Sequence, residues 1–256
     1  MSASSQRRPG HRLLIGLVAG GLIFAAGVVL ARSFGVGPWA PPPLDLTGPV
    51  AGWPTYGSDP GGTRYSPLTQ INAENVGHLE TAWTYRSGDL SRGSDSIPSR
   101  TSFQATPILL GRALYFSTPF SRVVALDAET GAELWTHDPE IDLSVRYSEN
   151  LVSRGVASWT APGEDERRGR CGRRILFGTL DARLLALDAE EGSPCGDFGA
   201  GGEVDLKVDV GRVEVGQYEV TSPPVVVGNV VAVGSGIGDN RKVAVERGTV
   251  RGFDVR

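Results

Sequence analysis

Residues 125–135 read ALDAETGAELW, and residues 186–192 repeat the same pattern as ALDAEEG. Each copy follows a short apolar run and leads into an acidic turn that ends in glycine. A small unit that recurs along a chain indicates a fold assembled from copies of one sheet. The repeat therefore predicts an all-β fold, and a β-propeller is the first hypothesis.

The sequence around the repeat favours short strands joined by turns. Residues 106–118 give two apolar runs hinged at Gly111, and residues 223–233 copy this hairpin with Gly228 and Asn229 at the turn. With 35 Gly and 17 Pro among 256 residues, the composition suits many turns better than long helices. Further strands are expected at residues 123–126, 174–178 and 184–187.

Two residues of the repeat have expected structural roles. The carboxylate of Asp127 can accept backbone N–H groups in the turn that it opens. Trp135 is expected to dock between neighbouring blades, because a tryptophan side chain buries roughly 150–250 Å². The second copy has no such tryptophan and carries Pro194, Cys195 and Gly196 in its place.

The number of repeats bears on how much of a propeller is present. A propeller closes its ring with roughly 4–8 blades of about 40–50 residues each. Residues 51–256, the expected propeller domain, hold roughly three or four units of that size. The last residues read RGFDVR, where a turn and a return strand should follow. We therefore expect the front part of a longer protein, about the first half of its propeller, or a truncated product.

The first 31 residues have the pattern of a targeting segment. Residues 13–31 carry no charge, and their length is close to the roughly 20 residues that cross a bilayer as a helix. The basic residues before this segment place residues 1–12 in the cytoplasm and the remainder in the periplasm, by the positive-inside rule. These basic residues are Arg7, Arg8 and Arg12.

A cleaved signal peptide is the alternative for the same segment, with Val29 and Ala31 as the small residues before the cut. The length of the apolar run favours a retained anchor, which predicts a single-pass protein of the inner membrane. Residues 32–50 are rich in proline and read as a stiff linker that holds the domain off the membrane.

The net charge and the positions of the cysteines limit which partners and metal sites are expected. The formal net charge of −4 gives no reason to expect nucleic acid as a partner. Cys171 and Cys195 flank the second repeat, and an oxidising compartment favours a disulfide between them. Neither cysteine has the CxxC spacing or the nearby histidine of a zinc site.

Several longer stretches match one family in the right order. Besides the repeat itself, they are WPTYGSDPGGTRYSPLTQIN (53–72), FQATPILLGRALYFSTP (103–119), SRGVASW (153–159), FGTLDARLLALDA (177–189), TSPPVVVGNVVAVGSGIGDN (221–240) and RGTVRGFD (247–254). Together they resemble the dehydrogenases that depend on pyrroloquinoline quinone (PQQ), eight-bladed propeller enzymes that oxidise sugars and alcohols. GTLDARL, TSPP and GDN are most similar to the membrane-bound glucose dehydrogenase branch.

The resemblance implies a cofactor site with a metal ion. Asp239 and Asn240 match the segment that supplies ligands to a divalent cation, Ca²⁺ or Mg²⁺, for which carboxylate and amide oxygens are suited. Arg154 matches the arginine that pairs with a PQQ carboxylate, a task for a planar guanidinium group. Further cofactor contacts are expected from Gln104, Asn150, Thr221 and Ser222.

Some positions depart from the family pattern. The alcohol branch has adjacent cysteines where this chain has Ser148 and Glu149. Glucose-oxidising relatives often carry His and Cys where this chain has Asn150 and Ser153. The general-base aspartate of the family would lie beyond Arg256, so no catalytic base is assigned.

The resemblance implies an oxidoreductase whose full-length form oxidises a glucose-like aldose or a polyol with PQQ and passes the electrons to ubiquinone. The alternatives are a noncatalytic β-propeller scaffold of the cell envelope and an inactive fragment. The motifs GDN, SRGV and TSPP favour the enzyme, because a scaffold has no need for ligand-type residues at those places.

Overall fold

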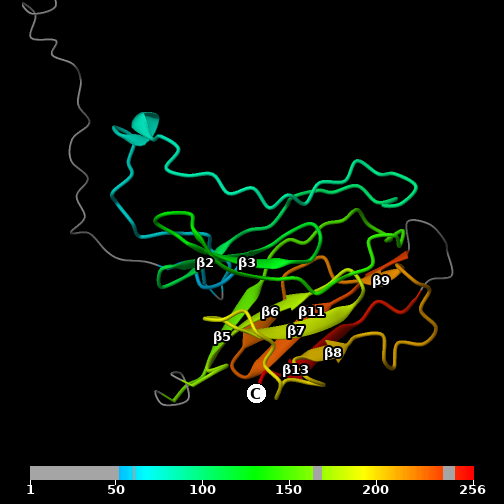
Figure 1. The fold of residues 1–256 in the computed structure, drawn as a ribbon. Coiled ribbons are helices and arrows are strands. Elements are labelled where there is room, and N and C mark those ends of the chain that lie inside the picture. Colours follow the sequence, from blue (N-terminus) through cyan, green and yellow to red (C-terminus); the bar gives the residue numbers. More distant parts are fainter. Residues whose placement is uncertain (1–51, 60, 164–168, 239–245) are drawn as a thin grey trace, which may run out of the picture. The chain divides into compact units, whose positions relative to one another are not determined.

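The computed structural model describes residues 52–59, 61–163, 169–238 and 246–256, which form strands and turns with almost no helix. Residues 70–79 form one part, with the 3₁₀ helix η1 (Val76–His78), and residues 52–69 and 80–256 form another that holds every described strand (Figure 1). None of the helices in the described ranges has the length and apolar character needed to cross a bilayer. The expected segments 1–12, 13–31 and 32–50 lie outside these ranges.

The first sheet is a four-stranded antiparallel meander. Its strands follow one another in the order β1 (Ile108–Leu110), β2 (Ala113–Ser117), β3 (Val123–Asp127) and β4 (Glu133–His137). The backbone at Gly111 is left-handed, with φ of 60°, which closes the tight turn between β1 and β2. The hairpin predicted at residues 106–118 is confirmed.

The second sheet copies the first in strand order and direction, as the sequence repeat predicts. It consists of β5 (Ala157–Thr160), β6 (Arg173–Gly178), β7 (Arg183–Asp188) and β8 (Glu203–Asp205). The third sheet contains β10 (Val225–Val227), β11 (Val230–Gly234) and β13 (Val250–Asp254), with Gly228 and Asn229 at the predicted turn. A small two-stranded sheet pairs β9 (Tyr218–Glu219) with β12 (Gly236–Ile237).

The second sheet is covered on both faces, which explains its nearly continuous apolar strands. Successive side chains of a strand point to opposite faces. Phe177 and Leu187 pack with residues of the first sheet, whereas Leu176 and Leu184 pack with residues of the third. Consecutive sheets therefore stack face to face, as blades of a propeller do.

A tryptophan docks on the repeated turn of the first sheet, and another docks on the repeated turn of the second. The Trp135 indole N–H donates to the carbonyl of Ala189, 3.1 Å away, and confirms the predicted docking between blades. Gly192 must be glycine because its φ is 69° and a Cβ there would lie 2.5 Å from the Trp135 ring. Trp83 docks in the same way on the first repeat, where its N–H donates to Ala128.

The repeated aspartate closes each turn. One Asp127 oxygen accepts the backbone N–H groups of Glu129 and Thr130 and the Thr130 hydroxyl, at 3.2, 2.9 and 2.9 Å. These bonds lower the pKa of the Asp127 carboxyl. Asp188 accepts two backbone N–H groups in the same geometry. The predicted turn role is confirmed in both copies.

Candidate cofactor site

The segments that precede the innermost strands of the three sheets are hydrogen-bonded side by side. The Leu151 amide donates to the carbonyl of Arg100 at 2.7 Å, and the Thr106 amide donates to the carbonyl of Arg154 at 3.0 Å. The Arg154 amide in turn donates to the carbonyl of Thr221 at 2.8 Å. We call this arrangement the inner ladder: residues 100–106, 151–155 and 220–222. It brings residues of three blades to one place.

Arg154 and Thr221 meet through their side chains as well as their backbones. Arg154 Nη1 donates to Thr221 Oγ1 at 2.6 Å, and both residues are half-buried. A guanidinium group carries five N–H donors and keeps its charge at any physiological pH. The pair therefore presents a fixed cation with a hydroxyl group beside it.

Gly155 allows this close approach. Its φ is 145°, and a Cβ at this position would lie 3.0 Å from the carbonyl oxygen of Thr106 and 3.7 Å from Pro223. Any larger residue would push the second inner segment away from both neighbours. In the SRGV motif, Arg154 supplies the charged side chain, and Gly155 allows the close backbone contact that positions it.

Tyr56 adjoins the same cluster and was not singled out in the sequence. Hydrogen bonds with Arg64 and Thr106 lower the pKa of the Tyr56 hydroxyl, and the positive charges of Arg64 and Arg154 add to this effect. The Arg64 guanidinium also lies over the Tyr56 ring, 5.0 Å from its centroid. Only the resemblance of residues 53–72 to the family could have drawn attention to it.

The other expected cofactor residues are placed separately along the inner segments. Gln104 is exposed, and its side-chain amide donates to Ser102 on its own segment at 2.8 Å. Ser222 follows Thr221 and is exposed, and Asn150 is exposed four positions before Arg154. Ser153 points away from these residues, because its buried hydroxyl donates to Ser117 of the first sheet at 2.7 Å.

The expected metal ligands Asp239 and Asn240 lie outside the described residues. Among the residues that are described, no group of three or more His, Cys, Asp or Glu side chains is arranged to hold a metal ion. The strand just before them is described: the Ser148 hydroxyl donates to the carbonyl of Ile237 at 3.2 Å. This contact ties β12 to the loop before Arg154.

Glu219 is a buried acid that the sequence reasoning missed. It is fully buried in β9, and its Oε1 accepts the backbone N–H of Glu149 at 2.8 Å. Burial of a carboxylate costs free energy unless the group is hydrogen-bonded. The bond from the Glu149 amide therefore stabilises the buried Glu219 side chain. Its place two residues before Thr221 in the sequence is the one signal that could have found it.

The two cysteines form a disulfide on the second sheet. Cys171 and Cys195 are bonded, with their Cα atoms 5.8 Å apart. Cys171 precedes β6 and Cys195 follows β7, so the bond clamps the outer part of this sheet. Both residues are buried with the core that the second and third sheets share.

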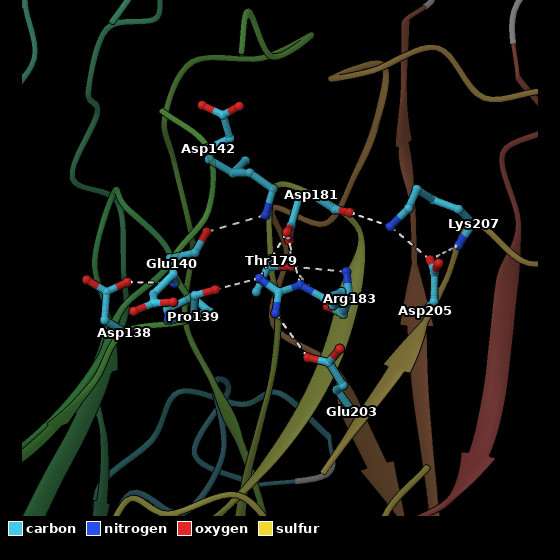
Figure 2. A network of polar contacts seen from close by, with 12 residues as sticks. Asp138, Pro139, Glu140, Asp142, Thr179, Asp181, Arg183, Glu203, Asp205 and Lys207 are labelled. Carbon is cyan, nitrogen blue, oxygen red and sulfur yellow. Dashed lines mark hydrogen bonds and ion pairs between the residues drawn. The ribbon is translucent and has the colours of Figure 1, made fainter. Parts of the chain in front are cut away.

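A second polar cluster, around Arg183, is structural. Figure 2 shows the Arg183 guanidinium between Asp181, Glu203 and the carbonyl of Pro139. The donor–acceptor distances are 2.9, 3.0 and 2.6 Å. Lys207 extends the network by donating to the Asp181 carbonyl and the Asp205 carboxylate. Because Arg183 and Lys207 are paired with acidic groups and backbone carbonyls, the network joins the chain after β4 to the second sheet.

The donor set on the inner ladder fits an anionic, oxygen-rich cofactor. PQQ is a tricarboxylate, and guanidinium, hydroxyl and amide groups are the donors that bind carboxylates. Arg154 and Thr221 offer these groups in contact. The residues present are therefore chemically suited to PQQ.

Comparison with known proteins agrees with this chemistry. The model of the family "PQQ: Glucose/ethanol/alcohol dehydrogenase, beta-propeller domain" matches residues 53–256. Quinoprotein glucose dehydrogenase of Escherichia coli is 37% identical over 218 residues, which are 83% of this chain and 27% of the relative. The quinate/shikimate dehydrogenase (quinone) of Acinetobacter baylyi is 34% identical over 224 residues, again 83% of this chain and 27% of the relative.

A solved structure shows the same fold. The quinohemoprotein alcohol dehydrogenase from Comamonas testosteroni superposes with a TM-score of 0.60 at 32% identity, over 80% of this chain and 25% of that protein. The chain thus spans about a quarter of the length of the relatives it matches. With the family match over most of its residues, this chain belongs to the PQQ-dependent glucose/ethanol/alcohol dehydrogenase family, through its β-propeller domain.

Proposed function

We propose that this chain is the cofactor-binding part of an eight-bladed quinoprotein dehydrogenase that oxidises a glucose-like aldose or a polyol. The observation that carries the proposal is the contact between Arg154 and Thr221 across two blades. Relatives named as dehydrogenases of glucose, of quinate or shikimate, and of glycerol support the reaction class. The electron acceptor in this proposal is ubiquinone, and residues 13–31 anchor the protein in the inner membrane with the propeller in the periplasm.

Each residue of the proposed site has a defined task. The chemistry that PQQ supplies when bound is the two-electron oxidation of an alcohol carbon. Arg154 holds a cofactor carboxylate through N–H groups other than the one that donates to Thr221, while Thr221 fixes the orientation of the guanidinium. Ser222, Gln104 and Asn150 add hydrogen bonds at the rim of the site. Asp239 and Asn240 bind the accompanying Ca²⁺ or Mg²⁺ through oxygen atoms.

Cofactor retention tests the proposal directly. The purified full-length chain, in detergent, is incubated with PQQ and CaCl₂ and desalted, and the retained cofactor is measured by its absorbance. We expect retention by the unmodified chain and at least about tenfold weaker binding for Arg154→Gln and Thr221→Val, because each removes part of a charge-assisted contact. Arg112→Gln is the matched control, since Arg112 is exposed on the β1–β2 turn and, among the described residues, forms its ion pairs with Asp127 and Glu129.

Dye reduction in the presence of glucose or glycerol is the second measurement. A chain that retains PQQ supports the proposed cofactor-binding part, and dye reduction further requires the catalytic base that is expected beyond Arg256. A chain with the circular dichroism of a β-sheet protein that retains no cofactor and reduces no dye would refute it and favour the scaffold or the inactive fragment.

A further inference from the structure

Residues 80–86 lie on the first sheet like a strand that has lost its sheet. Trp83 and Tyr85 are half-buried and pack on the first sheet, whereas Thr84 and Arg86 are exposed. This alternation is typical of a strand that packs with one face. Yet the backbone groups of residues 80–86 make no hydrogen bond with other residues that the structure describes. We call residues 80–86 the lone strand.

Side chains hold the lone strand in place. The Trp83 indole N–H donates to the carbonyl of Ala128 at 3.2 Å, and its ring fills the space where Gly131 has no Cβ. The Tyr85 hydroxyl donates to the Glu133 carboxylate at 2.6 Å. A strand that is already fixed loses little conformational freedom when a partner pairs with it, which favours binding.

The lone strand occupies the position of a fourth strand. In the first sheet the fourth strand is β4, and its Trp135 docks on the turn of the second sheet. Trp83 docks in the same way on the turn of the first sheet, and Thr84 follows Trp83 as Thr136 follows Trp135. The lone strand therefore stands where a sheet stacked on the first one would have its outer strand. No other strand of such a sheet is among the described residues.

The third sheet has the complementary arrangement. β11 and β13 pair in the same register as β2 and β3, since Val230 lies opposite Asp254 as Ala113 lies opposite Asp127. In the first sheet, β4 then pairs with the outer edge of β3. The corresponding edge of β13 has no strand beside it in the described ranges. An unpaired edge offers its N–H and C=O groups to another strand.

The third sheet also presents apolar side chains on its outer face. Val225, Val227 and Val250 are 59, 71 and 82% exposed. By the shared register of the hairpins, Val225 and Val227 correspond to Ile108 and Leu110, which pack against the second sheet. The valines thus occupy the positions through which the first sheet stacks on its neighbour.

The receiving surface is the open face of the first sheet. Leu114 and Phe116 line an apolar hollow of about 550 Å³ there, together with Trp83 and Tyr85 of the lone strand. Phe103 also lines it and is 57% exposed. Contiguous apolar surface of this kind marks an interaction site.

We infer that these two faces bind each other between copies of this chain. The third sheet of one copy packs on the first sheet of a second copy, and β13 of the one pairs antiparallel with the lone strand of the other. Ala125 lies opposite Trp135 within the first sheet, so Gly252 is expected opposite Trp83 of the second copy. Alanine and glycine are both small, which leaves room for the indole.

The contact joins two different faces, so copies associate head to tail. Each copy keeps one face of each kind, and the assembly is either a closed ring or an open row. The inference goes beyond the proposed function, because it rests on the two faces and needs no cofactor.

Analytical ultracentrifugation of the full chain in detergent measures the association. The mass should rise above that of one copy as the concentration increases. The double variant Val227→Asp/Val250→Asp should weaken association at least about tenfold, because it places charges on an apolar contact. Val215→Asp is the matched control, since Val215 is 79% exposed and lies outside both faces. A full chain that stays monomeric leaves both faces to sheets of another polypeptide and overturns the inference.

A change in the lone strand tests the other face. Thr84→Pro removes a backbone N–H from a position where a strand would pair, and Thr84 is exposed, so it should also weaken association at least about tenfold. If this variant loses the circular dichroism of a β-sheet protein, Phe103→Asp replaces it, because Phe103 is on the same face. Association through residues 13–31 would survive changes on both faces, and that result would overturn the inference.

A mixture of the two kinds of variant tests for two different faces. Val227→Asp/Val250→Asp keeps the face on the first sheet intact, and Thr84→Pro keeps the face on the third sheet intact. Each should be monomeric alone, and the two together should form a complex with one copy of each. A contact between like faces gives no such rescue, so its absence would overturn the inference.

Cofactor retention separates this inference from the proposed function. A chain that retains PQQ but stays monomeric keeps the dehydrogenase proposal and loses the assembly. A chain that associates through both faces but retains no PQQ keeps the assembly and loses the dehydrogenase proposal.

Discussion

The first and second sheets are built from the same repeat, yet they differ in burial. β6 and β7 of the second sheet are buried almost throughout, because the first and third sheets cover both faces. On the first sheet, Phe116, Val124 and Leu126 face a different surface, covered in part by Trp83 and Tyr85 and bordering an apolar hollow of about 550 Å³. The repeat determines the strand order of each sheet. The neighbouring sheets determine how much apolar surface it buries, and so how much it contributes to stability.

Truncation of matched core leucines should give the largest difference between the sheets. Leu187 and Leu126 occupy the same place in ALD, and both are buried. Leu187→Ala should cost about 4 kcal/mol because it leaves an enclosed cavity, and Leu126→Ala about 2 kcal/mol because its surroundings can relax into the hollow. Urea denaturation followed by tryptophan fluorescence measures both. Equal losses would show that the two faces are equally well packed.

Reduction of the disulfide should destabilise the second sheet, whereas the first sheet contains no cysteine. Cys171 and Cys195 are 24 positions apart, and a crosslink over a loop of that length is worth about 3 kcal/mol in the chain-entropy model. Unfolding measured with and without a reductant should show this loss. The double variant Cys171→Ala/Cys195→Ala should lose stability to a similar degree and should not respond to the reductant. A response that persists in the double variant would contradict the explanation.

The repeated aspartates provide a smaller comparison. Asp188 is buried, and besides closing its turn it accepts the backbone N–H of Cys171. Asp188→Ala should cost about 2 kcal/mol, because it leaves buried N–H groups without partners. Asp127→Ala should cost less, because solvent reaches its turn. Thermal unfolding of the two single variants tests the order, and a larger loss for Asp127→Ala would reverse it.

Acid should weaken the contact between the two sheets slightly. His137 in β4 is half-buried, with its ring 6.3 Å from that of Phe177 in β6. Burial lowers the pKa of His137 below its ordinary value of 6.5. The unfolded chain then binds the proton first, so stability is complete above pH 6.5 and falls as the pH drops through the lower folded pKa.

Chemical denaturation at pH values from about 7.5 to about 5, which bracket the ordinary histidine pKa, measures this effect. His137→Gln should remove the part of the pH dependence that belongs to this residue, and His78→Gln should leave it in place. An unchanged pH dependence in His137→Gln would assign the acid effect to other groups.

Apolar runs and turn residues predicted the strands of this fold better than they predicted the contacts between its blades. The hairpins at Gly111 and Gly228 follow from apolar runs and turn residues, and the structure contains both. Trp83 was missed, although residues 82–85 (AWTY) parallel residues 134–137 (LWTH). The parallel is short, and it becomes significant only when both rings are seen to dock on a repeated glycine.

The candidate site was predictable only in part, for a physical reason. Arg154 and Thr221 were named from family motifs, and the structure places them in contact. The polar hollow that Arg100 and Arg146 line was not foreseen, because it depends on the pairing of two segments that are distant in the sequence. A period of two along a strand tells which face a residue occupies, but it does not tell which residue of another blade lies opposite.

The inner ladder also has a consequence for biosynthesis. Arg154 and Thr221 are 67 positions apart, and contacts between residues so distant in sequence form only after the loop between them has closed. A nascent chain that ends before residue 220 has Arg154 and the first two segments of the ladder, but it lacks Thr221 and the third segment. In the proposed function, the cofactor therefore binds to the complete donor pair only after three blades have folded together.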